Sequence, residues 1–232
     1  MRRIVPLGGG GFSMEPRNLR LDKWLLTLTR RRRPRVLFLP TASGDSAGYV
    51  CRFYRAFSKH LCEAGHLSLF DRSATDPREI ILSSDLIYVG GGNTANMLSI
   101  WRVHGVDQTL RDAWHDGVIL CGVSAGAICW FEAGVTDSFG PELQPLHGGL
   151  GILKGSFCPH YDDAPRRPAY QRLVADGELT AGYAADDGAA ILFEDTAIAD
   201  VIRSRRGVAA YRVTRRMKAA VEETLDARLL AP

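Results

Sequence analysis

The segment Gly122-Val123-Ser124-Ala125-Gly126 carries the strongest chemical signal in this chain of 232 residues. It follows the apolar run 118–121, which is typical of a buried strand, and precedes the apolar stretch 127–131. In a strand–turn–helix setting, G-x-S-x-G holds the serine on a tight turn above the carboxyl end of a sheet. A helix that begins there favours developing negative charge. We therefore predict that Ser124 is a nucleophile; the alternative is a turn with a capping serine.

A serine hydroxyl needs a base to accept its proton at neutral pH. Among the six histidines, His160 differs because it lies in the segment 155–161, which reads as a strand running to its end. A histidine at that position would lie beside Ser124 at the same edge of the sheet. The other five lie near predicted helix ends or among glycines. We predict that His160 is the base; the alternative is a surface or capping histidine.

Gly90-Gly91-Gly92-Asn93 ends another predicted strand, and a helical stretch follows it. Backbone N–H groups exposed by glycines can bind an oxyanion or a phosphate. The segment lacks the G-x-G-x-x-G spacing and the G-K-[ST] ending of nucleotide-binding loops. An oxyanion hole made by the N–H of Gly91 or Gly92 together with that of Ala125 fits the serine better.

A metal site receives less support. Cys158, His160, Asp162 and Asp163 are clustered, but their spacing matches no zinc-ligand pattern. The five cysteines are scattered, with no C-x-x-C pair, as suits thiols in a reducing cytosol. We expect no metal and no cofactor.

The elements that position these residues alternate between strand and helix from residue 4 to about residue 132. Predicted strands cover 4–7, 36–39, 67–70, 86–89 and 118–121, and predicted helices 16–30, 45–64, 94–101 and 107–115. This alternation indicates a three-layer α/β fold around a doubly wound, mostly parallel sheet. The last third predicts a helix over 168–175 and hairpin-spaced strands at 189–193, 197–203 and 208–213. Without a clear linker, we assign residues 1–232 to a single domain.

Composition limits the classes of partner. Hydrophobic residues make up 46% and charged residues 24%, as in compact soluble proteins, and the net charge of +3 is too mild to imply nucleic acid. The basic run 30–35 is typical of a solvated helix end. No apolar stretch approaches the roughly 20 residues needed to span a bilayer, and the first residues lack the apolar region of a secretory signal. We expect a cytoplasmic protein with no membrane partner.

Three separated motifs add up to a family. G-G-G-N-T at 90–94, G-V-S-A-G-A at 122–127 and P-H-Y at 159–161 occur in the order and at the spacing of peptidase family S51. The chain resembles this family, which holds aspartyl dipeptidases (peptidase E) and cyanophycinases, from the first strand to about residue 190. The resemblance implies a class I glutamine amidotransferase-like fold with serine in place of cysteine at the turn. It implies Ser124 as nucleophile, His160 as base, and Gly92 and Ala125 at the oxyanion hole; we also assign Asn93 to substrate binding.

The third catalytic member has two candidates. Family members place a carboxylate after the histidine in an acidic-Gly pair, which Asp187 and Gly188 match, with aspartate replacing glutamate. Another assignment in such enzymes puts the aspartate between serine and histidine, which would be Asp137. In the α/β-hydrolases, too, the acid precedes the histidine, so with Asp137 as the acid an α/β-hydrolase is an alternative. We prefer Asp187, whose shorter side chain needs only a small backbone shift, and which would hold the imidazole tautomer.

Substrate preference depends on an arginine downstream of the histidine, which in the resembling enzymes neutralises a substrate carboxylate. Arg166 and Arg167 lie in that stretch; solvated loop arginines are the alternative. We predict a serine exopeptidase, a dipeptidase acting on small peptides, with aspartyl dipeptides as one candidate substrate. The rivals are an esterase, an amidase or a cyanophycinase-like hydrolase on the same scaffold, and a catalytically inactive small-molecule-binding homologue. A homodimer stays open, because the sequence fixes no oligomeric state.

Overall fold

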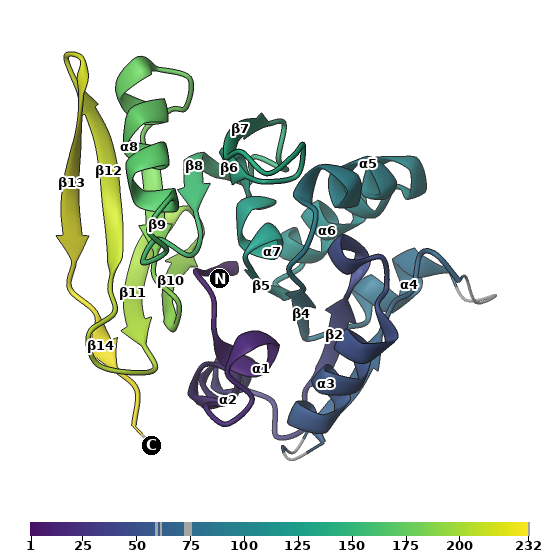
Figure 1. Cartoon of the computed structure of the whole chain (residues 1–232). Helices are drawn as coiled ribbons and strands as arrows, with labels where there is room; N and C mark the ends of the chain where they lie inside the picture. The colour runs from purple at the N-terminus through teal and green to yellow at the C-terminus, as the bar shows by residue number, and fades with distance from the viewer. Residues whose placement is uncertain (59, 61, 72–75, 232) are drawn as a thin grey trace.

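The computed structural model describes residues 1–58, 60, 62–71 and 76–231, and in them two β-sheets stand between layers of helices (Figure 1). The larger sheet has eight strands in the order β14-β11-β10-β1-β5-β4-β2-β3. Their bounds are β1 (Arg3–Leu7), β2 (Arg35–Leu39), β3 (Glu63–His66), β4 (Leu86–Val89), β5 (Ile119–Val123), β10 (Ala189–Glu194), β11 (Ala197–Arg203) and β14 (Arg228–Leu229).

The smaller sheet has six strands among the described residues, in the order β13-β12-β9-β8-β6-β7. Their bounds are β6 (Phe131–Thr136), β7 (Gln144–His147), β8 (Leu153–Cys158), β9 (Gly182–Ala185), β12 (Ala210–Arg216) and β13 (Ala219–Leu225). The helices are α1 (Gly11–Met14), α2 (Arg20–Thr27), α3 (Ala47–Phe57), α4 (Pro77–Leu82), α5 (Thr94–His104), α6 (Val106–His115), α7 (Ala125–Ile128) and α8 (Arg166–Asp176), with a 3₁₀ turn at Thr41–Ser43.

The layers follow from the alternation of side chains along buried strands. β1, β5, β4, β2 and β3 pair in parallel, and successive residues point to opposite faces. Val5 and Phe38 pack on the face covered by α1, α2 and α3, whereas Ile4 and Leu39 pack on the face covered by α4 to α7. The predicted three-layer, doubly wound and mostly parallel α/β fold is therefore confirmed.

The chain segments that follow β1 and β5 cross to opposite faces of the larger sheet. The chain passes from β1 to α1 and α2, but from β5 to α7, and β1 and β5 are neighbours. Such a switch point opens a crevice at the carboxyl ends of the two strands, where open α/β sheets bind ligands. Ser124 directly follows β5, so the fold places it at this crevice.

The C-terminal third is rich in hairpins, as expected, but its strands are divided between the two sheets. β10 and β11 do pair antiparallel at one side of the larger sheet, but β12 pairs with β13 and β9 in the smaller sheet. That sheet begins early, because α7 ends at Ile128 and Phe131 already opens β6. The apolar stretch 127–131 is therefore helical only at its start; Trp130 and Phe131 are aromatic residues, which favour strands.

One strand also lies earlier than expected. β3 covers Glu63–His66, whereas residues 67–70 follow it outside any strand. β3 is the outermost strand beside β2, so its side chains are only partly buried and its sequence carries no apolar run. The predicted helix 45–64 ends at Phe57, with residues 59 and 61 outside the described residues. No described helix is long and apolar enough to cross a membrane.

Candidate active site

Ser124 occupies a strained turn between β5 and α7. Its backbone has φ 57° and ψ −114°, a conformation that L-residues rarely adopt and that costs of order 1–3 kcal/mol. The turn is tight: a Cβ added at Gly122 would lie 2.2 Å from the carbonyl oxygen of Gly126. α7 has only four residues, so the predicted helix after Ser124 is a single turn. As its first residue, Ala125 has no carbonyl within the helix to receive its N–H.

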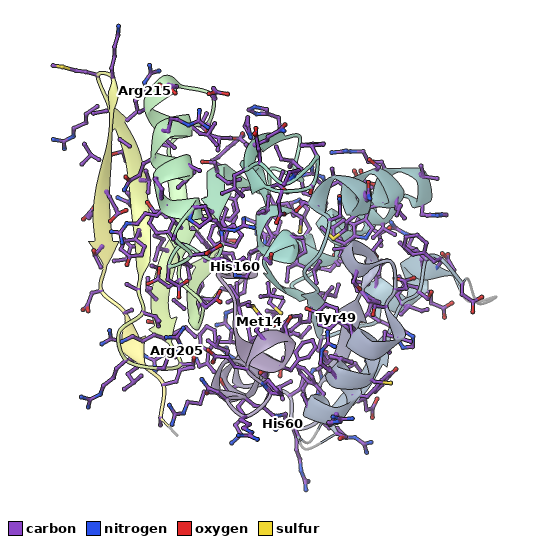
Figure 2. The ribbon with its side chains drawn as sticks, viewed as in Figure 1. Met14, Tyr49, His60, His160, Arg205 and Arg215 are labelled. Carbon is purple, nitrogen blue, oxygen red and sulfur yellow. The ribbon has the colours of Figure 1, made fainter. Side chains whose placement is uncertain are left out.

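His160 and Asp187 are joined directly. His160 Nδ1 lies 2.6 Å from Asp187 Oδ1, and the two side chains are 16% and 25% exposed. His160 follows the end of β8, in the smaller sheet, and Asp187 lies in the short connection from β9 to β10, which passes from one sheet to the other. The pair therefore forms where the two sheets meet. Figure 2 shows His160 near the centre of the molecule, between the two halves of the ribbon.

Three successive carbonyls at the end of β1 hold the three candidate segments together. The carbonyl of Leu7 accepts the N–H of Ser124 at 3.4 Å, and that of Gly8 accepts the N–H of His160 at 3.2 Å. The carbonyl of Gly9 accepts the N–H of Gly188, next to Asp187, at 3.1 Å. Residues far apart in the sequence thus converge on one strand end.

Gly9 is a site residue that the sequence reasoning missed. A Cβ at this position would lie 1.8 Å from Asp187 Oδ1 and 2.9 Å from His160 Nδ1. Only glycine lets the histidine–aspartate pair lie against the backbone that follows β1. The run of four glycines at 8–11 was the available signal, because consecutive glycines after a buried strand indicate a close approach.

The glycine loop after β4 lies beside Ser124. A Cβ at Gly91 would be 3.2 Å from the Cβ of Ser124, but the N–H of Gly91 donates to the Tyr49 hydroxyl at 3.2 Å. Tyr49 is buried, which raises the pKa of its hydroxyl, and it shares a 2.5 Å hydrogen bond with Ser13. The N–H of Gly92 has no hydrogen-bond partner among the described residues. Of the two predicted loop donors, Gly92 is thus the uncommitted one.

The hydroxyl of Ser124 makes no hydrogen bond to a described residue, His160 included. Catalytic hydrogen bonds are often loose in free enzymes and tighten only in the complex with substrate. The backbone contacts at the end of β1, rather than a formed serine–histidine bond, therefore define this site.

The two arginines have different surroundings. Arg166 is 8% exposed and lines an open pocket of about 440 Å³ together with Met14, His160, Asp162, Asp163 and Asp187. Arg167 instead forms an ion pair with Glu222, and its guanidinium lies over the ring of Tyr211, 5.0 Å from the centroid. Of this pair, only Arg166 lines the pocket that contains His160.

Asp137 and Asn93 make contacts away from the imidazole. Asp137 Oδ2 lies 3.2 Å from a guanidinium nitrogen of Arg166. Asn93 is the N-cap of α5: its Oδ1 accepts the N–H of Asn96 at 2.9 Å, and its Nδ2 donates to the carbonyl of Ser138 at 3.0 Å. Both side chains thus have structural partners, and the predicted role of Asn93 in substrate binding stays a prediction.

The described residues contain no group of three or more histidine, cysteine or acidic side chains placed to hold a metal ion. Cys158, one of the clustered candidates, is fully buried, and this burial raises the pKa of its thiol. The thiol therefore stays protonated near neutral pH and is not prepared to act as a ligand.

Comparison with known proteins matches the sequence to one family. The model of peptidase family S51 matches residues 4–201. The uncharacterized peptidase YgaJ of Bacillus subtilis is 54% identical over 214 residues, which cover 92% of each chain. A Peptidase E of Shewanella denitrificans is 31% identical over 107 residues, covering 46% of this chain and 43% of that protein.

Two solved structures share the fold. A peptidase from an acI-B1 Actinobacterium superposes with a TM-score of 0.72 at 18% identity, covering 98% of this chain and 95% of the other. A putative Peptidase E protein of Listeria monocytogenes gives a TM-score of 0.60 at 19% identity, covering 97% and 100%. At such identities the structures support the fold alone. The family match spans most of the chain, and from it follows that this protein belongs to peptidase family S51 and is a serine-type peptidase.

Proposed function

We propose that this peptidase cleaves short peptides through an acyl-enzyme on Ser124, with His160 as general base and Asp187 as the acid that orients it. One observation carries the proposal: the end of β1 binds the backbone of all three segments through three successive carbonyls. A serine, a base within the same crevice and a carboxylate on the base make the arrangement that activates a hydroxyl.

The histidine–aspartate contact sets the direction of proton transfer. With Nδ1–H donating to Asp187 across 2.6 Å, the lone pair of Nε2 is left to accept the proton of the serine hydroxyl. Ser124 then attacks the peptide carbonyl, and His160 passes the proton to the leaving amine. Water then attacks the acyl-enzyme while His160 takes one of its protons. The acid product leaves, and His160 returns that proton to the oxygen of Ser124, which regenerates the hydroxyl and the neutral base.

The developing oxyanion is assigned to the N–H groups of Gly92 and Ala125. The N–H of Gly91 already donates to Tyr49, whereas Gly92 has no partner among the described residues and Ala125 opens α7. Each such donor is worth about 10²–10³ in turnover.

For the substrate, we propose dipeptides that carry an acidic side chain beside the scissile bond. Arg166 supports this choice, because it is the buried cation in the pocket with His160, and a guanidinium binds a carboxylate with two parallel hydrogen bonds. A bound carboxylate would compete with Asp137, whose side chain is 58% exposed and free to move away.

The deciding experiment compares Ser124→Ala with Ser99→Ala, an exposed serine on α5 that serves as control. We expect the first variant to lose peptide hydrolysis and fluorophosphonate labelling while keeping its melting temperature, and the second to behave like the parent. Hydrolysis by Ser124→Ala at the parental rate would refute the mechanism. The cytoplasmic location and the oligomeric state stay predictions, which cell fractionation and light scattering would test.

A further inference from the structure

The backbone of Asp187 is held from both sides. Its N–H donates to Asp162 Oδ1 at 2.8 Å, and its carbonyl accepts a hydrogen bond from Arg205 Nη2 at 2.9 Å. The same guanidinium nitrogen lies 3.7 Å from Asp162 Oδ2, so Arg205 and Asp162 close a ring of contacts around the backbone of Asp187. Because Asp162 is two residues from His160, the ring also joins the histidine loop to the loop of its carboxylate partner.

The guanidinium of Arg205 is itself oriented. Its Nε donates to Glu15 Oε1 at 3.2 Å, and the other carboxylate oxygen of Glu15 accepts from Asn18 Nδ2 at 2.8 Å. The neighbouring Ser204 donates its N–H to the carbonyl of Gly188 at 2.8 Å. The residues that follow β11 therefore contact the Asp187–Gly188 segment at two consecutive carbonyls.

We propose that Arg205 is a positioning residue that keeps the Asp187 carboxylate on His160, an inference that rests on the proposed function of this pair. Arg205 lies beyond residues 4–201, which the family model matches, and it does not line the pocket that contains His160. In Figure 2 it is labelled beside the C-terminal strands, with His160 nearer the centre. It acts through Asp187 rather than on the substrate.

Loss of Arg205 should change the position of the Asp187 carboxylate more than the free energy of unfolding. The Arg205 side chain is 42% exposed, so its ion pairs contribute little to the free energy of unfolding. The hydrogen bond to the Asp187 carbonyl, however, restricts rotation of the Asp187 backbone and so the direction in which its carboxylate points. Without it, the short contact with His160 is populated less, and the serine proton has a poorly oriented acceptor. Asp162 and Asp187 also line the pocket, but neither carboxylate is assigned to substrate binding, so we expect KM to change little.

The test uses neighbouring arginines as a matched pair. Arg205→Met keeps the aliphatic stem and removes all donors, and Arg205→Lys keeps one charged donor. Arg206→Met alters an exposed arginine whose side chain makes no hydrogen bond or ion pair with a described residue. We expect kcat of Arg205→Met to fall about tenfold, the scale of one hydrogen bond to a charged group, with KM within about twofold of the parent. Arg205→Lys should recover part of kcat, and Arg206→Met should match the parent.

Proton NMR gives a second measurement that a purely structural role would not change. A histidine Nδ1–H bonded to a carboxylate at 2.6 Å has a strongly low-field resonance, which we expect in the parent and in Arg206→Met but broadened or lost in Arg205→Met. An unchanged kcat in Arg205→Met, or a loss confined to KM, would overturn the proposal. Ser124→Ala, assayed in parallel, distinguishes failure of the proposed function from failure of the positioning role. If Ser124→Ala is inactive while Arg205→Met is fully active, only the positioning role of Arg205 is refuted.

Discussion

His160 contacts one of the two carboxylates that the sequence offered as its partner. Asp187 lies 2.6 Å from Nδ1, whereas Asp137 pairs with Arg166. We therefore predict that Asp187→Asn lowers kcat about 10³-fold or more, because an amide stabilises the wrong imidazole tautomer. Asp137→Asn should lower kcat far less. Steady-state hydrolysis by the two variants measures both losses of kcat. A larger loss in Asp137→Asn would identify Asp137, and not Asp187, as the partner of His160.

A second prediction concerns Arg166. If it binds an acidic substrate side chain, Arg166→Met should lower kcat/KM for an aspartyl dipeptide about tenfold or more relative to its effect on an alanyl dipeptide, since a charge-assisted hydrogen bond is worth about 1.5–3 kcal/mol. Arg172→Met, on the exposed side of the same helix, is the control. An equal loss for both substrates would show that Arg166 supports the loop and not specificity.

Among the elements, α1 and α2 are joined by a buried carboxyl. Asp22 of α2 is fully buried; its Oδ2 accepts the N–H of Phe12 in α1 at 3.0 Å, and its Oδ1 has no partner among the described residues. Burial raises the pKa of Asp22 to about 7 from an ordinary value near 3.8. Between these values the folded protein keeps a proton that the unfolded chain releases, so stability falls as pH rises from about 4 to 7.

The third prediction follows from this sign. Over about three pH units the loss amounts to roughly 4 kcal/mol, and Asp22→Asn removes it because an amide does not titrate. The melting temperature of Asp22→Asn minus that of the parent should therefore grow from pH 5 to pH 8. Thermal unfolding at each pH measures this difference, with Asp116→Asn, on the exposed end of α6, as control. A difference that is constant with pH would contradict the assignment.

The fourth prediction concerns the contact between α3 and the loop after β4. Tyr49→Phe removes the acceptor of the Gly91 N–H and the partner of Ser13, at a position that is 5% exposed. Leaving such groups unpaired costs about 1–3 kcal/mol, measurable by urea unfolding, whereas Tyr54→Phe on the same helix should cost less. With Gly92 and Ala125 as oxyanion donors, kcat should change by no more than a few-fold. A clear rise in kcat would assign the oxyanion to the freed Gly91.

At the same scale, the sequence predicts those elements whose signal is local. The central parallel strands are apolar on both faces, and β4 and β5 lie within a residue or two of their predicted positions. β3 is a partly exposed strand at the side of the sheet and has no apolar run. The apolar run 67–70, which predicts a strand, instead follows β3 outside any strand. The second sheet, and the contacts of Tyr49 and Arg205, depend on pairing between distant segments, for which the sequence carries no periodic pattern.

For the whole molecule, the decisive arrangement is the meeting of the two sheets at the His160–Asp187 pair. Only the segment 186–188 separates β9 in the smaller sheet from β10 in the larger one. A continuous apolar core also spans both sheets, with Leu120 and Ile191 of the larger sheet packed in one cluster with Leu153 and Phe157 of the smaller. We therefore expect the site to depend on both sheets being folded at once; the assignment of residues 1–232 to one domain stays a prediction.

Phe131 gives the sharpest test of this dependence, because its ring lies between the sheets. Its centroid is 5.1 Å from that of Phe157 in the smaller sheet and 6.0 Å from that of Phe193 in the larger. Phe131→Ala should lower the free energy of unfolding by about 3–5 kcal/mol, whereas Phe139→Ala, at an exposed position, should change it by no more than about 0.5 kcal/mol.

The coincidence of unfolding transitions followed by different probes tests this dependence more directly than the midpoint of unfolding does. If the shared core makes the two sheets one cooperative unit, tryptophan fluorescence, far-UV circular dichroism and residual hydrolysis should move together to lower urea in Phe131→Ala. If the sheets were separate units joined only by the chain, activity would be lost in one transition and part of the secondary structure in another. Coincident transitions in parent and variant are expected, since Ser124 follows a strand of the larger sheet and His160 follows a strand of the smaller one.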